Sequence, residues 1–330
     1  MAGPIPANFA VFVTNAQTYI RNAYSSAPIS YTDYTTTVPT NTEVYADGWI
    51  GRMPKGREWI GPRVTNEPAA QTYQTTVLPF ELTYSLDRFR ADDDQYGVYY
   101  PILQDLAHQA AMLPEYQLRD FLEASGAYSG AAQTGLDGVS FFSTAHPVNF
   151  YSAAAGTYIN DFIGGQAVGG ATVGGALSAA AFGSMCEYMM TIKAEDGERL
   201  GVTPDLLIIP PTLMGCAEYI LKNAFSAPTS WDVFGSLGTQ VGASDNIYRR
   251  FGVRYLINKH LSSNTTYYVA DTTKAVKPLR WVQHTAPVFT NRIAENDPVV
   301  FDNHAFLWGW WARAVPAWSY AWLMSRGGPS

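Results

Sequence analysis

Residues 47–63 read DGWIGRMPKGREWIGPR and hold two near-copies of one motif, Trp49-Ile50-Gly51-Arg52 and Trp59-Ile60-Gly61-Pro62-Arg63. A turn signal, Pro54-Lys55-Gly56, separates the copies, so the segment is expected to form a β-ribbon. It contains no nucleophile paired with a base, no metal-ligand spacing and no phosphate-binding loop. Because such a ribbon has little core beneath it, we expect it to lie on another subunit.

The amino-acid composition limits what the surface of a single subunit can be. Of the 330 residues, 47% are hydrophobic and only 15% are charged, whereas ordinary soluble domains carry about a quarter charged residues. The surface must therefore be unusually apolar, or much of it must be buried against copies of the same chain. The 9 Trp, 21 Tyr and 16 Phe residues suit extended interfaces. A secreted β-protein that binds or hydrolyses glycans would also be rich in aromatic residues, so that alternative stays open.

The net charge of −7 and the pI near 5.2 argue against a protein that grips nucleic acid. An acidic container for DNA is compatible with this charge, because its wall should not trap the polymer. Cys186 and Cys216 fall in apolar helical patterns, so we expect free thiols and no disulfide framework. The N-terminal residues MAGPIP show neither a basic nor an apolar region, so no signal peptide is expected.

The apolar run from Leu307 to Met324 resembles a membrane span in composition only. Arg313 lies inside the run, and a central arginine costs about 2.5–3.5 kcal/mol on insertion scales. Large and small apolar residues recur along it with a period of two, which predicts strand. The residues of that face are Trp308, Trp310, Ala312 and Ala314, then Trp318, Tyr320, Trp322 and Met324.

Periodicity and turn signals predict the other elements. Helices are expected over residues 8–24, 99–124 with a bend at Pro114, 177–193 and 213–223. Strands are expected over residues 43–84 as the ribbon, with one strand from Tyr73 to Leu86, and over 206–209, 254–257, 267–270 and 279–324. Residues 28–43 are expected to form an arm on a neighbour or a surface loop. The Gly-rich residues 164–175 are expected to form a flexible loop.

No group of residues in the sequence predicts catalysis, a cofactor or a metal site. Asp92-Asp93-Asp94 supplies too few oxygens for calcium, and an acidic helix N-terminus explains it better. The five histidines show no metal-ligand spacing, and structural roles are expected for all of them. They are His108, His146, His260, His284 and His304. The chain is therefore expected not to be an enzyme.

Several blocks of the chain resemble the Mu-like major head subunit family of tailed phages. The two Trp-Ile-Gly copies, preceded by Gly48 and Glu58, look like that family's Gly-Trp-Leu-Gly and Glu-Trp-Val-Gly-Lys-Arg pair. Residues 100–104 (YPILQ), with Pro114 later in the same helix, are similar to its long helix and internal proline. The other matching blocks are 137–142 (DGVSFF), 146–148 (HPV), 275–278 (AVKP) and 302–309 (DNHAFLWG). Their shared order over roughly 260 residues makes the resemblance specific.

The resemblance implies an α+β fold of the HK97 type, the capsid fold of tailed phages. The C-terminal aromatic strands would then complete the sheet of the peripheral domain. The implied parts are an N-terminal arm (1–42), an extended β-loop (43–84), a discontinuous peripheral domain (85–176 and 276–330) with a spine helix at about 94–124, and an axial domain (177–275).

The same resemblance implies a major capsid protein that self-assembles as hexamers and pentamers into an icosahedral head. The head would enclose double-stranded DNA without sequence-specific binding, and no membrane would be involved. A separate scaffold or protease-scaffold protein is implied, since no scaffold-like segment is visible before residue 43. A portal and a decoration or cement protein would be further partners, in a virion assembled in the bacterial host cytoplasm. Another phage structural part, such as a tail or decoration protein, is the remaining alternative.

The intersubunit contacts are expected in the ribbon, because Trp and Arg are frequent interface anchors. The candidates are Trp49, Arg52, Lys55, Arg57, Glu58, Trp59 and Arg63. Some shells of this fold form Lys–Asn isopeptide links, which makes Asn303 or Asn291 a speculative partner of Lys55. An unactivated amine needs a base or desolvation to attack an amide, and the sequence shows no such arrangement. A solvated turn lysine or an intersubunit salt bridge is the simpler expectation.

Overall fold

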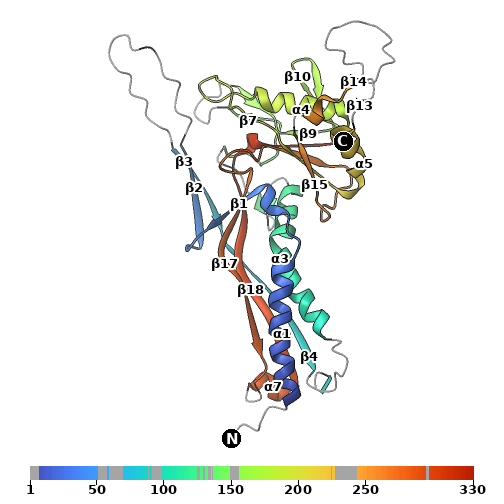
Figure 1. Cartoon of the computed structure of the whole chain (residues 1–330). Helices are drawn as coiled ribbons and strands as arrows, with labels where there is room; N and C mark the ends of the chain where they lie inside the picture. Colours follow the sequence, from blue (N-terminus) through green and yellow to red (C-terminus); the bar gives the residue numbers. More distant parts are fainter. Residues whose placement is uncertain are drawn as a thin grey trace.

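Two β-sheets and a projecting two-stranded ribbon organise the chain, which we describe from a computed structural model (Figure 1). The described residues are 7–50, 58, 70–87, 89–90, 99–124, 127–128, 131–132, 135, 137–148, 156–223, 225–226, 244–250, 252–294 and 297–330. A long four-stranded sheet with two helices forms a narrow part, and a five-stranded sheet with shorter helices forms a wider part. The α+β class expected from the sequence is confirmed.

The four-stranded sheet joins both ends of the chain. Strand β1 is parallel to β17, whereas β17, β18 and β4 are mutually antiparallel. Along β18, Trp308, Trp310, Ala312 and Ala314 are buried while Trp311 is exposed, so the expected period of two is confirmed here. In spatial order the strands are β1 (Thr35–Pro39), β17 (Leu279–Arg292), β18 (Ala305–Trp318) and β4 (Leu78–Asp87).

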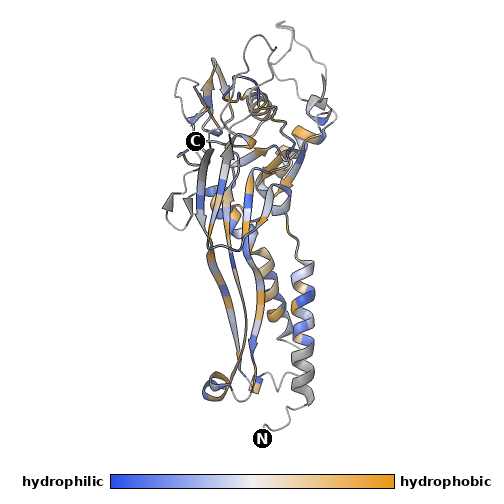
Figure 2. Cartoon of the chain, turned by 90° about the vertical axis from the view of Figure 1, so that its left-hand side faces the viewer, coloured by the Kyte–Doolittle hydropathy of each residue, from blue (hydrophilic) through white to orange (hydrophobic). Residues whose placement is uncertain are grey.

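Helices α1 (Ala7–Ser26) and α3 (Tyr100–Glu123) lie along one face of the long strands (Figure 2). Helix α3 buries residues three or four positions apart, such as Leu103, Leu106 and Ala110, which is the pattern that predicted it. It continues through Pro114, as expected. Since proline has no N–H, it removes one hydrogen bond from the middle of the helix.

The ribbon consists of β2 (Val44–Ile50) and β3 (Ala70–Thr76), paired antiparallel from Val44–Thr76 to Ile50–Ala70. The expected ribbon is therefore confirmed for its two strands, and its central residues 51–57 and 59–69 lie outside the described residues. One strand was expected from Tyr73 to Leu86, but that prediction is wrong. Strand β3 ends at Thr76, and the N–H of the next residue, Val77, donates to Glu43 O. Strand β4 then begins at Leu78 and pairs with β18 of the four-stranded sheet.

The five-stranded sheet forms a second core. Leu206, Leu207, Ile208 and Ile209 of β12 are buried on both faces, as their continuous apolar run predicted. Its strands, in spatial order, are β15 (Arg254–Ile257), β12 (Leu206–Ile209), β16 (Tyr267–Ala270), β19 (Met324–Gly328) and β9 (Asp161–Ile163). Helices α4 (Ala179–Thr191), α5 (Met214–Lys222) and α6 (Ile247–Arg250) belong to this part of the chain.

The Gly-rich segment is an ordered β-hairpin, so the expectation of a flexible loop is wrong. Strands β10 (Gln166–Val168) and β11 (Ala171–Val173) pair antiparallel around Gly169 and Gly170, whose φ angles are 58° and 88°. The other two glycine doublets also have positive φ angles, which only glycine adopts without strain. They are Gly164-Gly165 and Gly174-Gly175.

The remaining elements are short. The two-stranded pairs are β5 (Ala127–Tyr128) with β6 (Ala131–Ala132), β7 (His146–Pro147) with β8 (Thr157–Tyr158), and β13 (Phe225–Ser226) with β14 (Ser244–Asp245). The helical turns are η1 (Tyr31–Asp33), η3 (Pro211–Leu213), α7 (Pro298–Asn303) and η4 (Ala321–Leu323). None of the described helices is long and apolar enough to cross a membrane.

Two more expectations need correction. Within residues 28–43, Thr35–Pro39 are neither a loop nor an arm on a neighbour, because β1 pairs with β17 of the same chain through Thr35–Leu279 and four further positions. The C-terminal aromatic run is not one strand, since η4 interrupts it and β19 then pairs with β16 of the other sheet. Residues 92–94, the proposed acidic helix start, lie outside the described residues. The division into arm, extended loop, peripheral and axial parts stays a prediction.

Candidate functional site: the ribbon base and the junction between the sheets

The base of the ribbon lies against the four-stranded sheet through one of its faces. In the register of β2 and β3, Tyr45 is opposite Thr75 and Asp47 is opposite Tyr73, so these four side chains share a face. Tyr73 and Thr75 are buried, as is Val77 just beyond them. Burial raises the pKa of the Tyr73 hydroxyl from 10.0 to about 12. The face therefore belongs to the core of the subunit.

A buried ion pair joins this face to the sheet. Arg280 of β17 pairs through Nη1 with Asp47 Oδ2, and the two side chains are only 8% and 18% exposed. The same Nη1 donates to Tyr45 Oη at 3.4 Å. Burial raises the pKa of the Tyr320 hydroxyl, and the nearby Arg280 opposes that shift. An arginine with so little solvent requires this carboxylate, because an unpaired buried charge is strongly unfavourable.

The predicted contact residues mostly lie beyond this base. Trp49 is in β2 opposite Gln71, and Glu58 is exposed. The structure does not test the contact role of either residue. The others, Arg52, Lys55, Arg57, Trp59 and Arg63, lie outside the described residues.

The two speculative partners of Lys55 occupy different places. Asn303 is the exposed last residue of α7, which lies at the far end of the narrow part (Figure 1). Asn291 is exposed in β17, opposite Trp308. Strands β2 and β3 lie far from α7 (Figure 1), and Lys55 itself lies outside the described residues. The proposed link stays a prediction.

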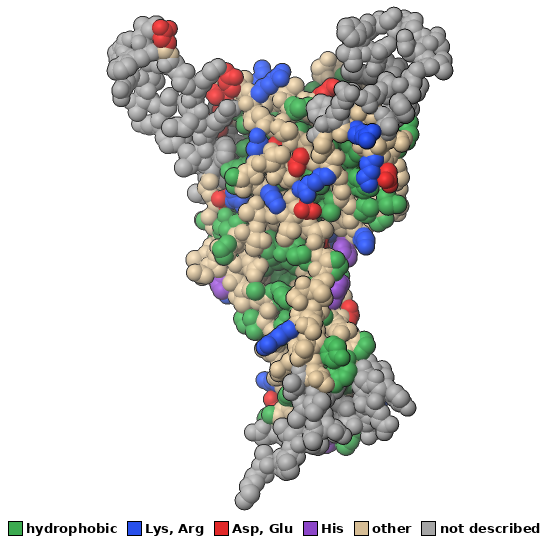
Figure 3. All heavy atoms as spheres, viewed as in Figure 1, with side chains coloured by type: hydrophobic (Ala, Val, Ile, Leu, Met, Phe, Trp, Pro, Cys, Tyr) green, Lys and Arg blue, Asp and Glu red, His purple; other side chains and the backbone are tan. Residues whose placement is uncertain are grey.

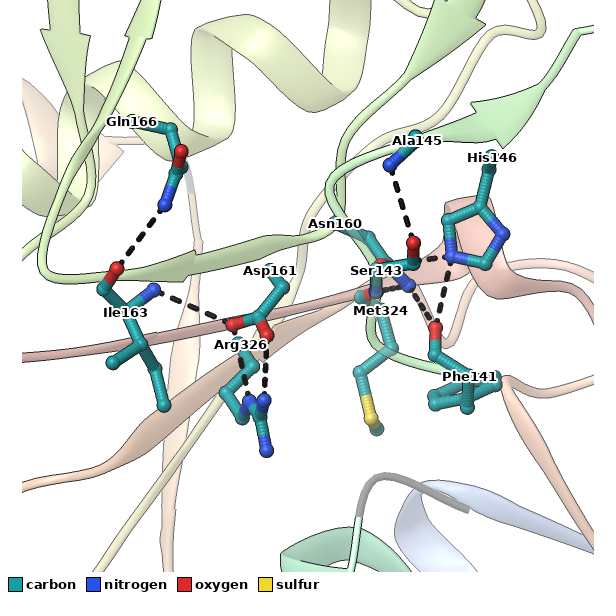
Figure 4. A network of polar contacts seen from close by, with 10 residues as sticks. All are labelled: Phe141, Ser143, Ala145, His146, Asn160, Asp161, Ile163, Gln166, Met324 and Arg326. Atoms are coloured by element: carbon teal, nitrogen blue, oxygen red, sulfur yellow. Dashed lines mark hydrogen bonds and ion pairs between the residues drawn. The ribbon is translucent and has the colours of Figure 1, made fainter. Parts of the chain in front are cut away.

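A polar network ties the loop before β7 to the end of the chain (Figure 4). His146 is fully buried, and its Nδ1 lies 2.5 Å from Asp137 Oδ2. Its Nε2 lies 3.0 Å from both Phe141 O and Asn160 Oδ1. Both ring nitrogens face oxygen atoms, so both can donate a hydrogen bond when the ring is protonated. The Tyr158 ring stacks on the imidazole with 4.9 Å between centroids.

Asn160 is the centre of this network. Its Nδ2 donates to Phe141 O at 2.6 Å, Ala321 O at 3.1 Å and Met324 O at 3.3 Å. Its Oδ1 accepts from Ser143 N at 2.8 Å. Ala321 and Met324 lie where the chain runs from β18 of the four-stranded sheet to β19 of the five-stranded sheet. The buried Asn160 side chain therefore stabilises this connection between the two sheets.

A second ion pair closes the junction. Arg326 of β19 donates to Asp161 of β9 through Nη2 at 2.5 Å and Nε at 3.2 Å, which is a two-point contact (Figure 4). The guanidinium also lies 4.9 Å above the Phe142 ring. Sequence reasoning did not find this pair. The blocks DGVSFF and HPV were visible in the sequence, but nothing there showed that they meet near the C-terminus.

Two glutamates of α3 hold neighbouring segments. Glu115, which is 1% exposed, accepts through Oε1 from Ser30 N, Ser30 Oγ and Tyr31 N. Glu123 accepts from Ser262 N at 2.5 Å and from Ser262 Oγ at 2.6 Å. These contacts attach the segment before β1 and the loop before β16 to the C-terminal half of the helix.

Cysteine chemistry and metal binding have little support. Cys186 in α4 and Cys216 in α5 are free thiols, as predicted, although both are only partly buried. Burial raises the pKa of the Cys186 thiol to about 12 and also raises that of Cys216. In the part of the chain that is described, no group of His, Cys, Asp and Glu side chains could hold a metal ion.

Charge is unevenly distributed on the face seen in Figure 3. The described Lys, Arg, Asp and Glu side chains gather over the wider part, whereas the narrow part shows mostly apolar and uncharged side chains. Exposed apolar side chains of the narrow part include Phe89, Phe301 and Trp311, which are 62%, 75% and 41% exposed. Depletion of charge together with exposed aromatics is typical of surfaces that become buried in assemblies.

Comparison with known proteins identifies the family. The sequence model of the Mu-like prophage major head subunit gpT matches residues 9–171, 166–234 and 252–327. The major capsid protein of Escherichia phage Mu is 28% identical over 155 residues, which are 47% of this chain and 49% of that protein. The FluMu major head subunit of Haemophilus influenzae is 29% identical over 128 residues, which are 39% of this chain and 40% of that protein. The chain therefore spans about half the length, or less, of these curated relatives.

The fold has relatives among solved capsids. A chain of the procapsid of bacteriophage JBD30 superposes with a TM-score of 0.55 at 22% identity, covering 99% of this chain and 77% of that one. This likeness confirms the HK97-type capsid fold, and it does not favour the glycan-binding alternative. Since the family's sequence model also covers most of the residues, the chain belongs to the Mu-like prophage major head subunit family.

Proposed function

We propose that this chain is the major capsid protein of a phage head. Its copies form hexamers and pentamers that close into an icosahedral shell around double-stranded DNA. The observation that carries the proposal is the match to the head-subunit family along most of the chain. The capsid fold supports it, and so does the acidic net charge of −7, which suits a wall that does not trap DNA.

The shape of the subunit supports assembly by symmetric closure. The ribbon projects from the body, and the exposed face of the narrow part is poor in charge (Figures 1 and 3). A contact repeated at every symmetry-related copy can be weak and still stabilise a closed shell. The chain itself is the principal partner in this proposal, and its action is structural rather than catalytic.

The ribbon residues are proposed to make the contacts with a neighbouring copy. Trp49, Arg52, Arg57, Trp59 and Arg63 are the anchors, because tryptophan and arginine dominate interface energies. Lys55 and Glu58 add charged contacts at the same ribbon. A covalent link from Lys55 to Asn303 of another copy is the speculative extension of this arrangement.

The remaining partners are proposed from the same reasoning. A separate scaffold or protease-scaffold protein guides assembly in the bacterial host cytoplasm, and a portal occupies one vertex. A decoration or cement protein binds the finished shell, which is part of the virion.

The proposal is tested by electron microscopy of the protein expressed with its neighbouring scaffold gene. Closed polyhedral shells or ring-like capsomers are expected. Uniform monomers of about the chain mass of 36.2 kDa, across salt and pH, would refute it. Arg57→Ala and Trp59→Ala should abolish particles but leave folded subunits, while Arg249→Ala, at an exposed position of α6, serves as a matched control. Denaturing electrophoresis of particles reports the Lys55 link, which requires a ladder of covalent oligomers.

A further inference from the structure

We propose that Arg280 and Asp47 form a latch that fixes the direction of the ribbon and thereby makes the subunit competent to assemble. The inference rests on the proposed capsid function and assigns a positioning role within it. Arg280 belongs to the body, in β17, and Asp47 belongs to the ribbon, in β2. The pair therefore joins the part that must stay rigid to the part that reaches a neighbour.

Because the Arg280–Asp47 pair is largely buried, the position of the ribbon relative to β17 depends on it. Arg280 lies between Leu279 and Trp281, which are 0% and 2% exposed, and it is itself almost fully buried. The ion pair recorded for it among the described residues is with Asp47, and Tyr45 Oη accepts from the same nitrogen. If the ribbon swung away, the guanidinium would lose the Asp47 carboxylate and the Tyr45 hydroxyl, and the neutral Tyr320 hydroxyl beside it would not replace a carboxylate. Loss of one partner of a buried pair is far more costly than loss of a surface pair.

The apolar contacts at the ribbon base do not set a direction in the same way. Val77 is buried against the core, but contacts between apolar groups are non-directional and tolerate sliding. A charged hydrogen bond depends on both distance and angle. Because Asp47 directly precedes Gly48-Trp49, a change of angle at the latch would move the rest of β2, up to Ile50.

The first test replaces charge while keeping shape. Asp47→Asn and Arg280→Gln are made separately and together, with Glu43→Gln as a matched control, since Glu43 is exposed just before β2. We expect each single change at the pair to lower particle yield at least tenfold by sedimentation and electron microscopy. The double change leaves two neutral amides that can bond each other, and its yield should recover to within about threefold of the parent.

The second test measures the ribbon in unassembled subunits. Spin labels at Glu58→Cys and Glu218→Cys, both exposed sites, report the distance from the ribbon to α5 in a Cys186→Ala, Cys216→Ala background. One narrow distance distribution is expected with the intact pair and a clearly broader one with Asp47→Asn. Normal particle yield together with an unchanged distribution in Asp47→Asn would overturn the latch and leave the capsid function standing.

The two proposals fail in different ways. If the unmodified protein forms no particles under any condition, the capsid function fails, while the distance distributions still show whether the pair sets the ribbon's direction. If a single variant does not fold, the neutral double variant carries the test. Its distance distribution should then match that of the parent, and a broad distribution would overturn the latch.

Discussion

Replacing Asn160 with leucine is expected to destabilise the subunit by about 2–6 kcal/mol. Leucine is similar in size to asparagine but cannot bond the four main-chain groups that Asn160 contacts. Ser143 N loses the acceptor 2.8 Å away and Met324 O loses a donor at 3.3 Å, while Ala321 O keeps the Met324 N–H as a donor. Phe141 O still faces His146 Nε2 at 3.0 Å, so its loss is smaller. A buried group left without a partner costs about 1–3 kcal/mol, and two such groups, Ser143 N and Met324 O, give the stated range.

The measurement is urea unfolding of the unassembled subunit, followed by tryptophan fluorescence and by far-ultraviolet circular dichroism. Both probes are needed because two sheets could unfold separately, and only coincident transitions permit a single free energy. Asn291→Leu is the matched control, since Asn291 is exposed in a strand and should change stability by less than about 0.5 kcal/mol. A free energy of unfolding for Asn160→Leu within the range of that control would refute the role of the network.

Three further outcomes follow from buried groups. Because the pKa of Tyr73 is raised to about 12, the folded state holds the hydroxyl proton more tightly than the unfolded state does. The free energy of unfolding should therefore keep its full value below pH 10 and fall by up to about 3 kcal/mol as the pH rises through about 12. The fall should be smaller in Tyr73→Phe, which has no hydroxyl to ionise. With a pKa of about 12, Cys186 should react with iodoacetamide at pH 8 much more slowly in the folded protein than in urea; equal rates by mass spectrometry would contradict this. Gly327→Ala would place Cβ 2.4 Å from the buried Tyr267 ring and should cost about 1–3 kcal/mol by urea unfolding, whereas Gly328→Ala, whose nearest neighbours are at 3.5 Å, should cost much less.

The elements with a strong local signal were predictable. Strands over residues 254–257 and 267–270 begin and end where expected, and Leu206–Ile209 is buried along its whole length. Helix α3 and its internal Pro114 follow from the spacing of leucines and alanines alone. In each case the residues that determine the element are close together in the sequence, so the period of the apolar residues is enough to predict a helix or a strand.

The errors arise where tertiary contacts override local composition. Residues 28–43 contain few large aliphatic side chains, yet Thr35 and Val38 of β1 pair with β17 because that strand offers a free edge. The Gly-rich segment looked featureless because its side chains are small. Its information lay in three glycine doublets, each supplying positive φ angles around two three-residue strands.

The candidate site was only half visible in the sequence. The ribbon motif named the residues that are proposed to touch a neighbour, because tryptophan, arginine and turn signals act locally. The contacts that hold the ribbon base and the junction between the sheets were not visible in the sequence. Arg280 and Tyr45 are 235 positions apart, and Asn160 and Ala321 are 161 positions apart. A charge within an apolar strand, such as Arg280 between Leu279 and Trp281, is the signal that could have been used.

The Asp47–Arg280 pair and the contacts of Asn160 each join a segment from the first half of the chain to a segment from its last quarter. Asp47 of the ribbon lacks Arg280 until β17 is in place, and Asn160 lacks its contact with Met324 until the chain reaches that residue. A chain that has not yet formed β17 to β19 therefore cannot hold its ribbon in the latched direction. Under the proposed function, this order keeps incomplete chains from presenting correctly placed contact residues, so the topology itself makes assembly depend on finished folding.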